Sequence, residues 1–424
     1  MSASSSPVEL HDVACPFCGL VCDDLVVTEH DGRLSVRANG CRISTPAFER
    51  APSSDAPRLA GRAVPLAEAV SGAARLLHAA RQPLFAGLGT DVGGSRAIVR
   101  LAERCGGVLD HMNSAAGVRD TMVLQDSGWI ATTLSEVRNR ADLLVVAGRD
   151  VVGRFPRFYE RCVTNTESMF TGERRCEIVF LGEGPAEGAP PLAAAVTVVP
   201  CAMEQLRGVC AVLRALVAGR RAPTMGVGGL PLDVLKSLAE RMQAARYGVL
   251  AWSAAELNVP HAELTVQALC ELVTELGRRT RFSGLPLAGG DGDATFESVH
   301  LWHSGFGART GYGRGYAVYD PYHFSTARML DSGEADALVW ISSFSETRTP
   351  PATAVPTVVL GRAGMSCAPE PAVFIPVGTP GLDHPGHLFR TDRVVALPLA
   401  GLRTSRLPTV AQAVEAIEGA LACC

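Results

Sequence analysis

The most informative stretch of this sequence is Cys15-Pro16-Phe17-Cys18-Gly19-Leu20-Val21-Cys22-Asp23-Asp24, which Cys41 follows farther along the chain. Three cysteines spaced Cys-x2-Cys-x3-Cys, with a distant fourth, suit the corners of a [4Fe–4S] cluster. Zinc is the alternative metal, but its usual pattern has two Cys-x2-Cys pairs, and the second pair is missing here. A third interpretation is a set of ordinary thiols. The spacing predicts that Cys15, Cys18, Cys22 and Cys41 converge in space and leaves the occupancy of the site open.

The composition indicates a globular protein with a large apolar core. The chain has 424 residues, 47% of them hydrophobic, and a formal net charge of −4. This charge gives no reason to expect nucleic acid or an anionic membrane as a partner. No apolar run reaches membrane-spanning length, and the polar start at residues 1–7 shows no secretory signal. Thirteen cysteines without an export signal therefore predict a cytoplasmic protein that uses them as thiols or metal ligands.

Short apolar strands alternate with helix-like segments along most of the chain. Residues 25–27 and 34–36 flank Asp31-Gly32 and predict a hairpin directly after the cysteines. The other predicted strands are 83–87, 141–147, 177–181, 247–251, 335–341 and 354–360, and the predicted helices are 66–80, 95–105, 230–244 and 263–274. This alternation predicts an α/β fold with parallel sheets covered on both faces. Residues 47–57 are rich in Pro and Ser and predict a linker.

Conventional catalytic and phosphate-binding motifs are weak or absent. Residues 87–94 are Gly-rich and lie between a predicted strand and helix, but they match neither a GxGxxG fingerprint nor a P-loop. A second Gly-rich stretch, 304–315, contains Arg309 and Arg314, which could pair with phosphate. A turn between sheet and helix is the favoured interpretation of both stretches. There is no GxSxG elbow and no HExxH motif.

Residues 15–24 resemble the N-terminal signature of the B subunit of formylmethanofuran dehydrogenase, a branch of the molybdopterin oxidoreductase family. Further stretches resemble that subunit in the same order, namely 133–143, 314–321 with 333–337, and 375–377 with 389–392. The resemblance implies a molybdopterin-oxidoreductase-like fold of doubly wound parallel sheets. It also implies a small Cys-bearing domain at 1–56, a discontinuous α/β domain at 57–142 and 320–424, and an inserted α/β domain at 143–319.

The departures from this family bear on function. In the stretch 110–117, Ala116 stands where the family has the cysteine that binds molybdenum or tungsten, and Gly117 stands where a histidine follows it. Alanine cannot ligate a metal and glycine cannot relay a proton. The turns at Arg149-Asp150 and Ser343-Phe344 also differ from the family pattern. The comparison therefore implies no catalytic residue at this position, and no molybdopterin, molybdenum or tungsten.

One branch of the family is expected to look like this. The formyltransferase/hydrolase complex of methylotrophic bacteria moves a formyl group from tetrahydromethanopterin to a methanofuran-type carrier and hydrolyses it to formate, without a redox step. The resemblance implies a catalytically silent, structural B subunit. Its implied partners are an amidohydrolase-type hydrolytic subunit, a formyltransferase subunit and a further structural subunit, with contact to the carrier as an open point. A [4Fe–4S] cluster would then survive only as a structural element, or the thiols would carry no metal.

Two other classes stay open at this point. The first is a working molybdenum or tungsten formylmethanofuran or formate dehydrogenase, and Ala116 counts against it. The second is an Fe–S electron-transfer protein, which would usually need a further cluster or flavin site, and no second cysteine set is present. The sequence leaves open the stoichiometry of the complex, the carrier analogue and whether the former pterin cleft binds anything.

Overall fold

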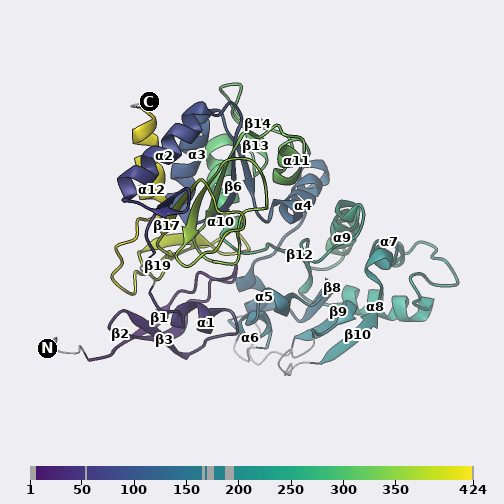
Figure 1. Cartoon of the computed structure of the whole chain (residues 1–424). Coiled ribbons are helices and arrows are strands. Elements are labelled where there is room, and N and C mark those ends of the chain that lie inside the picture. Colours follow the sequence, from purple (N-terminus) through teal and green to yellow (C-terminus); the bar gives the residue numbers. More distant parts are fainter. Residues whose placement is uncertain (1–5, 53–54, 165–167, 170–175, 187–194, 423–424) are drawn as a thin grey trace. The chain divides into compact units, whose positions relative to one another are not determined.

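The computed structural model describes residues 6–52, 55–164, 168–169, 176–186 and 195–422 (Figure 1). The chain divides into two compact units, of which unit 1 comprises Met1–Ala115 and Gly290–Cys424 and unit 2 comprises Ala116–Gly289. Unit 2 is thus inserted into the sequence of unit 1. These units begin and end at other positions than the domains 1–56, 57–142 with 320–424, and 143–319, and that three-domain division remains a prediction.

Unit 1 is built on one large sheet. Among the residues described, nine strands form it in the order β14-β13-β7-β6-β15-β16-β17-β4-β5. The central neighbours β7 to β17 run parallel, whereas the outer strands pair antiparallel. The bounds are β4 Arg58–Leu59, β5 Arg62–Ala63, β6 Pro83–Gly89, β7 Val108–His111, β13 Thr310–Gly311, β14 Val318–Tyr319, β15 Ala337–Ser342, β16 Thr357–Arg362 and β17 Val373–Val377.

Alternating side chains of the central strands enter two separate cores. Phe85, Val339 and Ile375 belong to the core that includes side chains of α2 (Leu66–Ala79), α3 (Val92–Cys105), α10 (Asp293–Ser304) and α12 (Val410–Leu421). Leu84 and Trp340 point to the other face, where they join Met329 of α11 (Thr326–Asp331). Burial on both faces explains why these strands read as continuous apolar runs. Figure 1 shows α2, α3 and α12 side by side.

The N-terminal segment forms its own small sheet within unit 1. Strands β1 (Val8–Val13), β2 (Leu25–His30) and β3 (Arg33–Ala38) pair antiparallel, and the short helix α1 (Ser44–Glu49) packs against β3. Asp31 and Gly32 have φ of 50° and 78°, the left-handed values that a two-residue hairpin turn requires. Ala14 and Val21 pack on Phe344, Leu388 and Leu399, the last two of which belong to the hairpin of β18 (Gly386–Phe389) and β19 (Ala396–Leu399).

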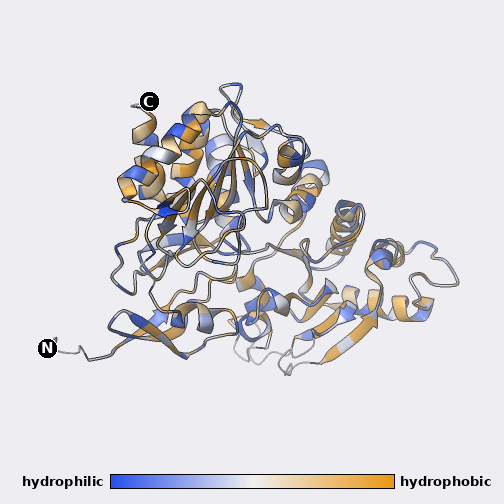
Figure 2. Ribbon diagram, in the orientation of Figure 1, coloured by the Kyte–Doolittle hydropathy of each residue, from blue (hydrophilic) through white to orange (hydrophobic). Residues whose placement is uncertain are grey.

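Unit 2 has an entirely parallel sheet in the order β10-β9-β8-β11-β12 among its described residues. The strands are β8 Leu143–Arg149, β9 Glu177–Gly184, β10 Val196–Pro200, β11 Gly248–Ser253 and β12 Phe282–Leu287, and the helices are α5 Leu134–Arg140, α6 Phe158–Cys162, α7 Leu206–Val217, α8 Leu232–Ala244 and α9 Ala262–Gly277. One face packs against α7, α8 and α9. Figure 2 shows the strongly hydrophobic strands of this sheet. Helix α4 (Ser114–Ser127) begins in unit 1 and continues into unit 2.

The α/β class and the doubly wound parallel sheets predicted from the sequence are confirmed. The hairpin around Asp31-Gly32 is present, and the six other predicted strands correspond to β6, β8, β9, β11, β15 and β16. The linker predicted from residue 47 is wrong at its start, because α1 extends to Glu49 and buries Phe48. No helix among the described residues is long and apolar enough to cross a membrane.

Candidate functional site

The carboxyl edge of the large sheet contains the point at which the strand order reverses. The chain winds from β6 outward to β7 on one side and later to β15 on the other, so the order reverses between β6 and β15. Open α/β sheets bind ligands in the crevice at such a switch point. Here the two strand ends are bonded directly, because both the backbone N–H and the hydroxyl of Ser343 donate to Gly89 O, at 2.8 and 2.9 Å.

The loop before α10 closes the crevice further. A Cβ placed on Gly292 would lie 2.6 Å from Thr90 O, so the backbone of this loop rests directly on the end of β6. The Asp91 carboxylate caps α3 by accepting from Gly94 N–H at 3.0 Å. This cap occupies the helix N-terminus at which an anion would otherwise bind. The Gly-rich stretch 87–94 therefore acts as a packed turn from strand to helix.

A polar network follows β7 at the same edge. Arg348 pairs with the Asp291 carboxylate at 3.1 Å and donates to Asn113 Oδ1 at 2.6 Å. The Asn113 amide in turn donates to Gly290 O at 2.9 Å. Its backbone N–H donates to His111 Nδ1 at 3.0 Å, so the proton of the neutral ring lies on Nε2, which faces Asp291 O at 3.3 Å.

His111 is held in its neutral form. Burial lowers its pKa to about 4, although the neighbouring Asp291 acts in the opposite direction. A buried ring that donates one hydrogen bond and accepts another is satisfied structurally without a second proton. His111 therefore fits a packing role at this edge better than a role in proton transfer.

Arg309, for which the sequence left phosphate binding open beside the favoured interpretation as a turn, is engaged within the protein. Its Nε pairs with Asp110 at 3.4 Å and its Nη1 donates to Pro321 O at 2.5 Å. The other oxygen of Asp110 accepts from both the backbone N–H and the hydroxyl of Thr326, each at 2.7 Å. Arg314 of the same stretch is exposed. Asp110 of β7 thus links the second Gly-rich stretch, through Arg309, to α11, through Thr326.

Three of the N-terminal cysteines, Cys15, Cys18 and Cys22, lie on the loop between β1 and β2, and Cys41 lies between β3 and α1. The N–H of Cys15 donates to Cys22 O at 2.7 Å, and the N–H of Val21 donates to Cys18 O at 3.1 Å. Cys41 precedes α1, where the N–H and hydroxyl of Ser44 donate to its sulfur at 3.4 and 3.3 Å. Hydrogen bonds to sulfur of this kind are found around metal-bound thiolates.

Burial and the neighbouring thiolates raise the pKa of two of the N-terminal cysteines. Burial raises the pKa of Cys18 to about 12, and the charges of Cys22 and Cys41 act in the same direction. Burial also raises the pKa of Cys15, and the negative charge of a Cys18 thiolate raises it further. The donor chemistry therefore fits a four-thiolate centre. Among the residues described, no group of three or more His, Cys, Asp or Glu side chains is arranged to hold a single metal ion. The convergence of Cys15, Cys18, Cys22 and Cys41 on one centre therefore stays a prediction.

Ala116 and Gly117 lie in the first turns of α4, which the sequence-based assignment of elements missed. Neither residue is fully buried, and a Cβ on Gly117 would meet no atom within 4 Å. Space for a larger side chain therefore exists at this position. The stretch that the resemblance aligns with the family's metal-binding residues thus carries two small residues, and the space around Gly117 is open.

The altered turns have structural roles. Asp150 accepts from Tyr159 Oη at 2.7 Å and from the N–H groups of Val152 and Ala186 at 3.1 and 2.9 Å. Burial raises the pKa of Tyr159 far above its usual value, and Asp150 contributes to the shift. In unit 1 Phe344 packs against Ala14 and Val21. Both turns are therefore occupied by the protein's own side chains.

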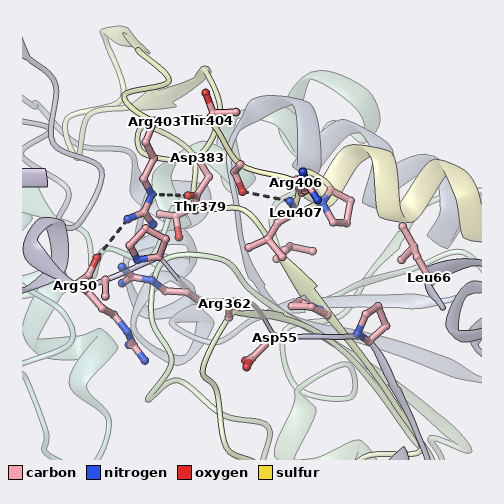
Figure 3. A pocket seen from close by; sticks show the side chains of 18 residues that line it. Arg50, Asp55, Leu66, Arg362, Thr379, Asp383, Arg403, Thr404, Arg406 and Leu407 are labelled. Carbon is pink, nitrogen blue, oxygen red and sulfur yellow. Dashed lines mark hydrogen bonds and ion pairs between the residues drawn. The ribbon is translucent and has the colours of Figure 1, made fainter. Parts of the chain in front are cut away.

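Sequence reasoning missed a cavity at the ends of β16 and β17. Its lining includes Arg50, Arg362, Arg403 and Arg406 (Figure 3). These arginines come from distant segments, and no motif joins them. Only the fold places them together.

The two doubly wound sheets and the N-terminal Cys-bearing segment form a molybdopterin-oxidoreductase-like fold. Acetylene hydratase from Pelobacter acetylenicus superposes with a TM-score of 0.62 over 97% of this chain and 70% of that one, at 9% identity, which supports the fold alone. No family model matches the sequence.

Curated relatives narrow the class. The B subunit of the formyltransferase/hydrolase complex Fhc of Methylorubrum extorquens is 30% identical over 338 residues, which cover 79% of this chain and 88% of the relative. The B subunit of the tungsten-containing formylmethanofuran dehydrogenase 2 of Methanocaldococcus jannaschii is 26% identical over 400 residues, covering 91% and 92%. The chain belongs to the family that comprises the B subunits of formylmethanofuran dehydrogenase and of the Fhc complex.

A solved structure agrees with this assignment. A chain in the crystal structure of the Methylorubrum extorquens formyltransferase/hydrolase complex with methylofuran superposes with a TM-score of 0.71 at 26% identity. The match covers 87% of this chain and 99% of that one. The resemblance inferred from residues 15–24 and the later stretches is therefore confirmed at the level of the family.

Proposed function

We propose that this chain is a structural, non-redox subunit of a formyltransferase/hydrolase complex. The complex would convert formyl-tetrahydromethanopterin to formate through a methanofuran-type carrier in one-carbon oxidation. Its partners would be an amidohydrolase-type hydrolytic subunit, a formyltransferase subunit and a further structural subunit, and its location the cytoplasm.

The closed switch-point crevice of unit 1 is the observation that carries the proposal. The Ser343–Gly89 hydrogen bonds and the loop at Gly292 occupy the place where a doubly wound sheet would accept a cofactor. Ala116 adds an independent argument, because a methyl side chain offers no electron pair to molybdenum or tungsten. The similarity to the Fhc B subunit over 88% of that relative supports the choice of complex.

Reconstitution with and without this chain tests the scaffold role. Obligate interfaces commonly bury more than about 2,000 Å² in total, so the other subunits should fail to assemble without it. We expect formate production to be lost in its absence and restored when it is added back. Assembly and full-rate turnover by the remaining subunits would contradict the proposal.

Elemental analysis of the native complex separates this function from a dehydrogenase. We expect no stoichiometric molybdenum or tungsten and no formate oxidation with viologen dyes. Stoichiometric molybdenum or tungsten, or formate oxidation with viologen dyes, would favour the working dehydrogenase instead. A matched control is the Ala116→Cys variant, which should also lack the metal because the crevice of unit 1 stays closed.

We also propose that Cys15, Cys18, Cys22 and Cys41 supply the thiolates of a [4Fe–4S] centre with a structural role. Such a centre would cross-link the N-terminal loop, and its binding would release protons from thiols whose pKa burial has raised. Iron and sulfide analysis of anaerobically purified complex tests this, with Cys18→Ser expected to lose the iron. Cys105→Ser, outside the loop, is the control and should retain it. Absence of iron from the anaerobic parent would leave an unmetallated thiol loop.

A further inference from the structure

A cavity of about 400 Å³ opens in unit 1 at the carboxyl ends of β16 and β17 (Figure 3). It is formed by residues from 50–66, 362–383 and 403–408. Its volume lies within the usual range of small-molecule sites. It is separate from the closed crevice between β6 and β15, since it lies on strands farther along the sheet.

The lining of the cavity carries a surplus of positive charge. Among the described residues that line it there are four arginines, Arg50, Arg362, Arg403 and Arg406, and two aspartates, Asp55 and Asp383. Both carboxylates already accept hydrogen bonds from the protein. Asp383 accepts from Arg403 Nε and from Thr379 N–H, each at 2.8 Å, and Asp55 accepts from Gly364 N–H at 2.5 Å.

The deepest of these arginines is fixed in place. Arg362 is 6% exposed, and its two terminal nitrogens donate to Phe344 O at 2.9 Å and Ala47 O at 3.0 Å. Glu346 pairs with Arg362 at 3.6 Å and also with Arg50. Counting Glu346 with the two aspartates still leaves one arginine in excess. Burial lowers the pKa of Arg362, Glu346 opposes this, and Arg50 adds to it.

Arg406 is the arginine best placed to meet a ligand. Its side chain is exposed at the cavity, and no hydrogen bond or ion pair joins it to any residue that the structure describes. Arg403, by contrast, is anchored by Asp383 and by Arg50 O at 3.3 Å (Figure 3). Guanidinium groups bind carboxylate and phosphate through paired hydrogen bonds.

Much of the remaining wall is apolar, beside the hydroxyl groups of Thr379, Thr404 and Ser405. Leu66, Pro376, Val377, Leu407 and Pro408 line it. An inorganic anion would leave this surface wet, whereas a flat or aliphatic group would cover it and gain from burial. The cavity thus joins a cationic end to an apolar wall.

We propose that this cavity binds a small organic anion, with a carboxylate or phosphate held at Arg406 and an apolar body against Val377 and Leu407. This inference does not depend on the role of the chain in the proposed complex. It assigns a ligand site that the redox-inactive crevice does not provide.

Calorimetric titration of the full chain with three matched probes tests the site. The probes are 1-naphthoate, 1-naphthyl phosphate and the neutral 1-naphthalenemethanol. We expect at least one anion to bind about tenfold or more tightly than the neutral probe, because charge-assisted hydrogen bonds are stronger than those of a neutral hydroxyl group. The preferred anion distinguishes a carboxylate from a phosphate ligand.

Variants locate the binding. Arg406→Gln should weaken the anion about tenfold and leave the neutral probe unchanged, while Arg96→Gln on exposed α3 surface should change neither. Leu407→Trp should obstruct the cavity and weaken all three probes. Equal binding of anion and neutral probe would overturn the proposal, as would anion binding that survives both Arg406→Gln and Leu407→Trp. The urea midpoint of each variant shows that the fold is intact.

Discussion

The two units use the same kind of winding but close their carboxyl edges in different ways. In unit 1 the edge is polar, with Ser343 bonded to Gly89 and Arg348 paired with Asp291. In unit 2 the order reverses between β8 and β11, where a Cβ on Gly148 would meet Met203 and Leu257 at 3.2 and 3.3 Å. Apolar side chains therefore pack on this strand end, next to the hydrogen bonds that Asp150 accepts at the same edge.

This difference shows two physical ways in which side chains can pack against the carboxyl edge of a doubly wound sheet. Hydrogen bonds and ion pairs need specific partners and respond to pH and to single polar substitutions. Apolar filling responds mainly to volume. Unit 1 also contains buried histidines, His111 and His300, whereas His261 of unit 2 is exposed. The units should consequently fail under different conditions.

Acidification should produce the largest difference in stability between the two units. Burial lowers the pKa of both His111 and His300 from 6.5 to about 4, so the neutral form stabilises unit 1 above pH 6.5 and this contribution is lost as pH falls toward 4. Each histidine should contribute a loss of about 2 kcal/mol between pH 7.5 and pH 5. Hydrogen exchange by mass spectrometry should show unit 1 peptides losing protection. His261→Gln is the control, and equal losses in unit 2 would break the comparison.

Asp150→Ala should produce the largest single-residue effect in unit 2. It removes the acceptor of three hydrogen bonds, from Tyr159 Oη and from the backbone of Val152 and Ala186. Each buried donor that is left unsatisfied costs about 1–3 kcal/mol. With three such donors, we expect the free energy of unfolding to fall by about 3 kcal/mol. Urea unfolding monitored in unit 2 peptides checks this. Asp150→Asn, which keeps an acceptor, should recover much of the loss, and an unchanged unfolding midpoint for Asp150→Ala would contradict the assigned role.

Arg348→Met should cost unit 1 about 1 kcal/mol. The substitution removes the bonds to Asp291 and Asn113, but the side chain is 40% exposed, so solvent already screens the pair. Arg328→Met, which breaks the exposed pair with Glu334, is the matched control and should change the free energy of unfolding by less than about 0.5 kcal/mol. Equal effects for the two variants would show that the polar edge of unit 1 adds no stability.

Gly117→Ala should have the smallest effect and the opposite sign. The added methyl group meets no atom within 4 Å in helix α4, so removing glycine's backbone freedom should stabilise by up to about 1 kcal/mol. Turnover of the complex should stay nearly unchanged. Gly305→Ala is a matched control with equally open space, but its φ of 80° should make that variant destabilising. A loss of stability in Gly117→Ala would mean that this turn of α4 is under an unseen constraint.

Local patterns were enough to predict those parts of the fold in which neighbouring residues decide the outcome. Asp31-Gly32 predicted its hairpin because both positions need left-handed backbone, and 141–147 predicted β8 because a strand buried on both faces is apolar throughout. Helix α4 was missed because it has only a weak apolar stripe. The linker predicted over 47–57 is wrong at its start, because Phe48 is buried by tertiary packing that the Pro/Ser-rich composition does not indicate.

The site followed the same division. The cysteines of 15–22 are local, and their spacing predicts that they converge in space with Cys41, which stays a prediction. The pairing of Arg309 with Asp110 could not be predicted, because Asp110 lies far away in sequence. The arginines of the cavity come from three distant segments, so only the packing of β16 and β17 brings them together.

The bond between Asn113 and Gly290 has an evolutionary consequence. These residues lie where the chain leaves unit 1 and where it returns, so the two ends of the insertion are fastened to each other within the host. Domain insertion is tolerated when the ends that it joins are close together. A lineage could therefore exchange, trim or enlarge the inserted module while the host retains its own folding information, and the two modules could accumulate substitutions at independent rates.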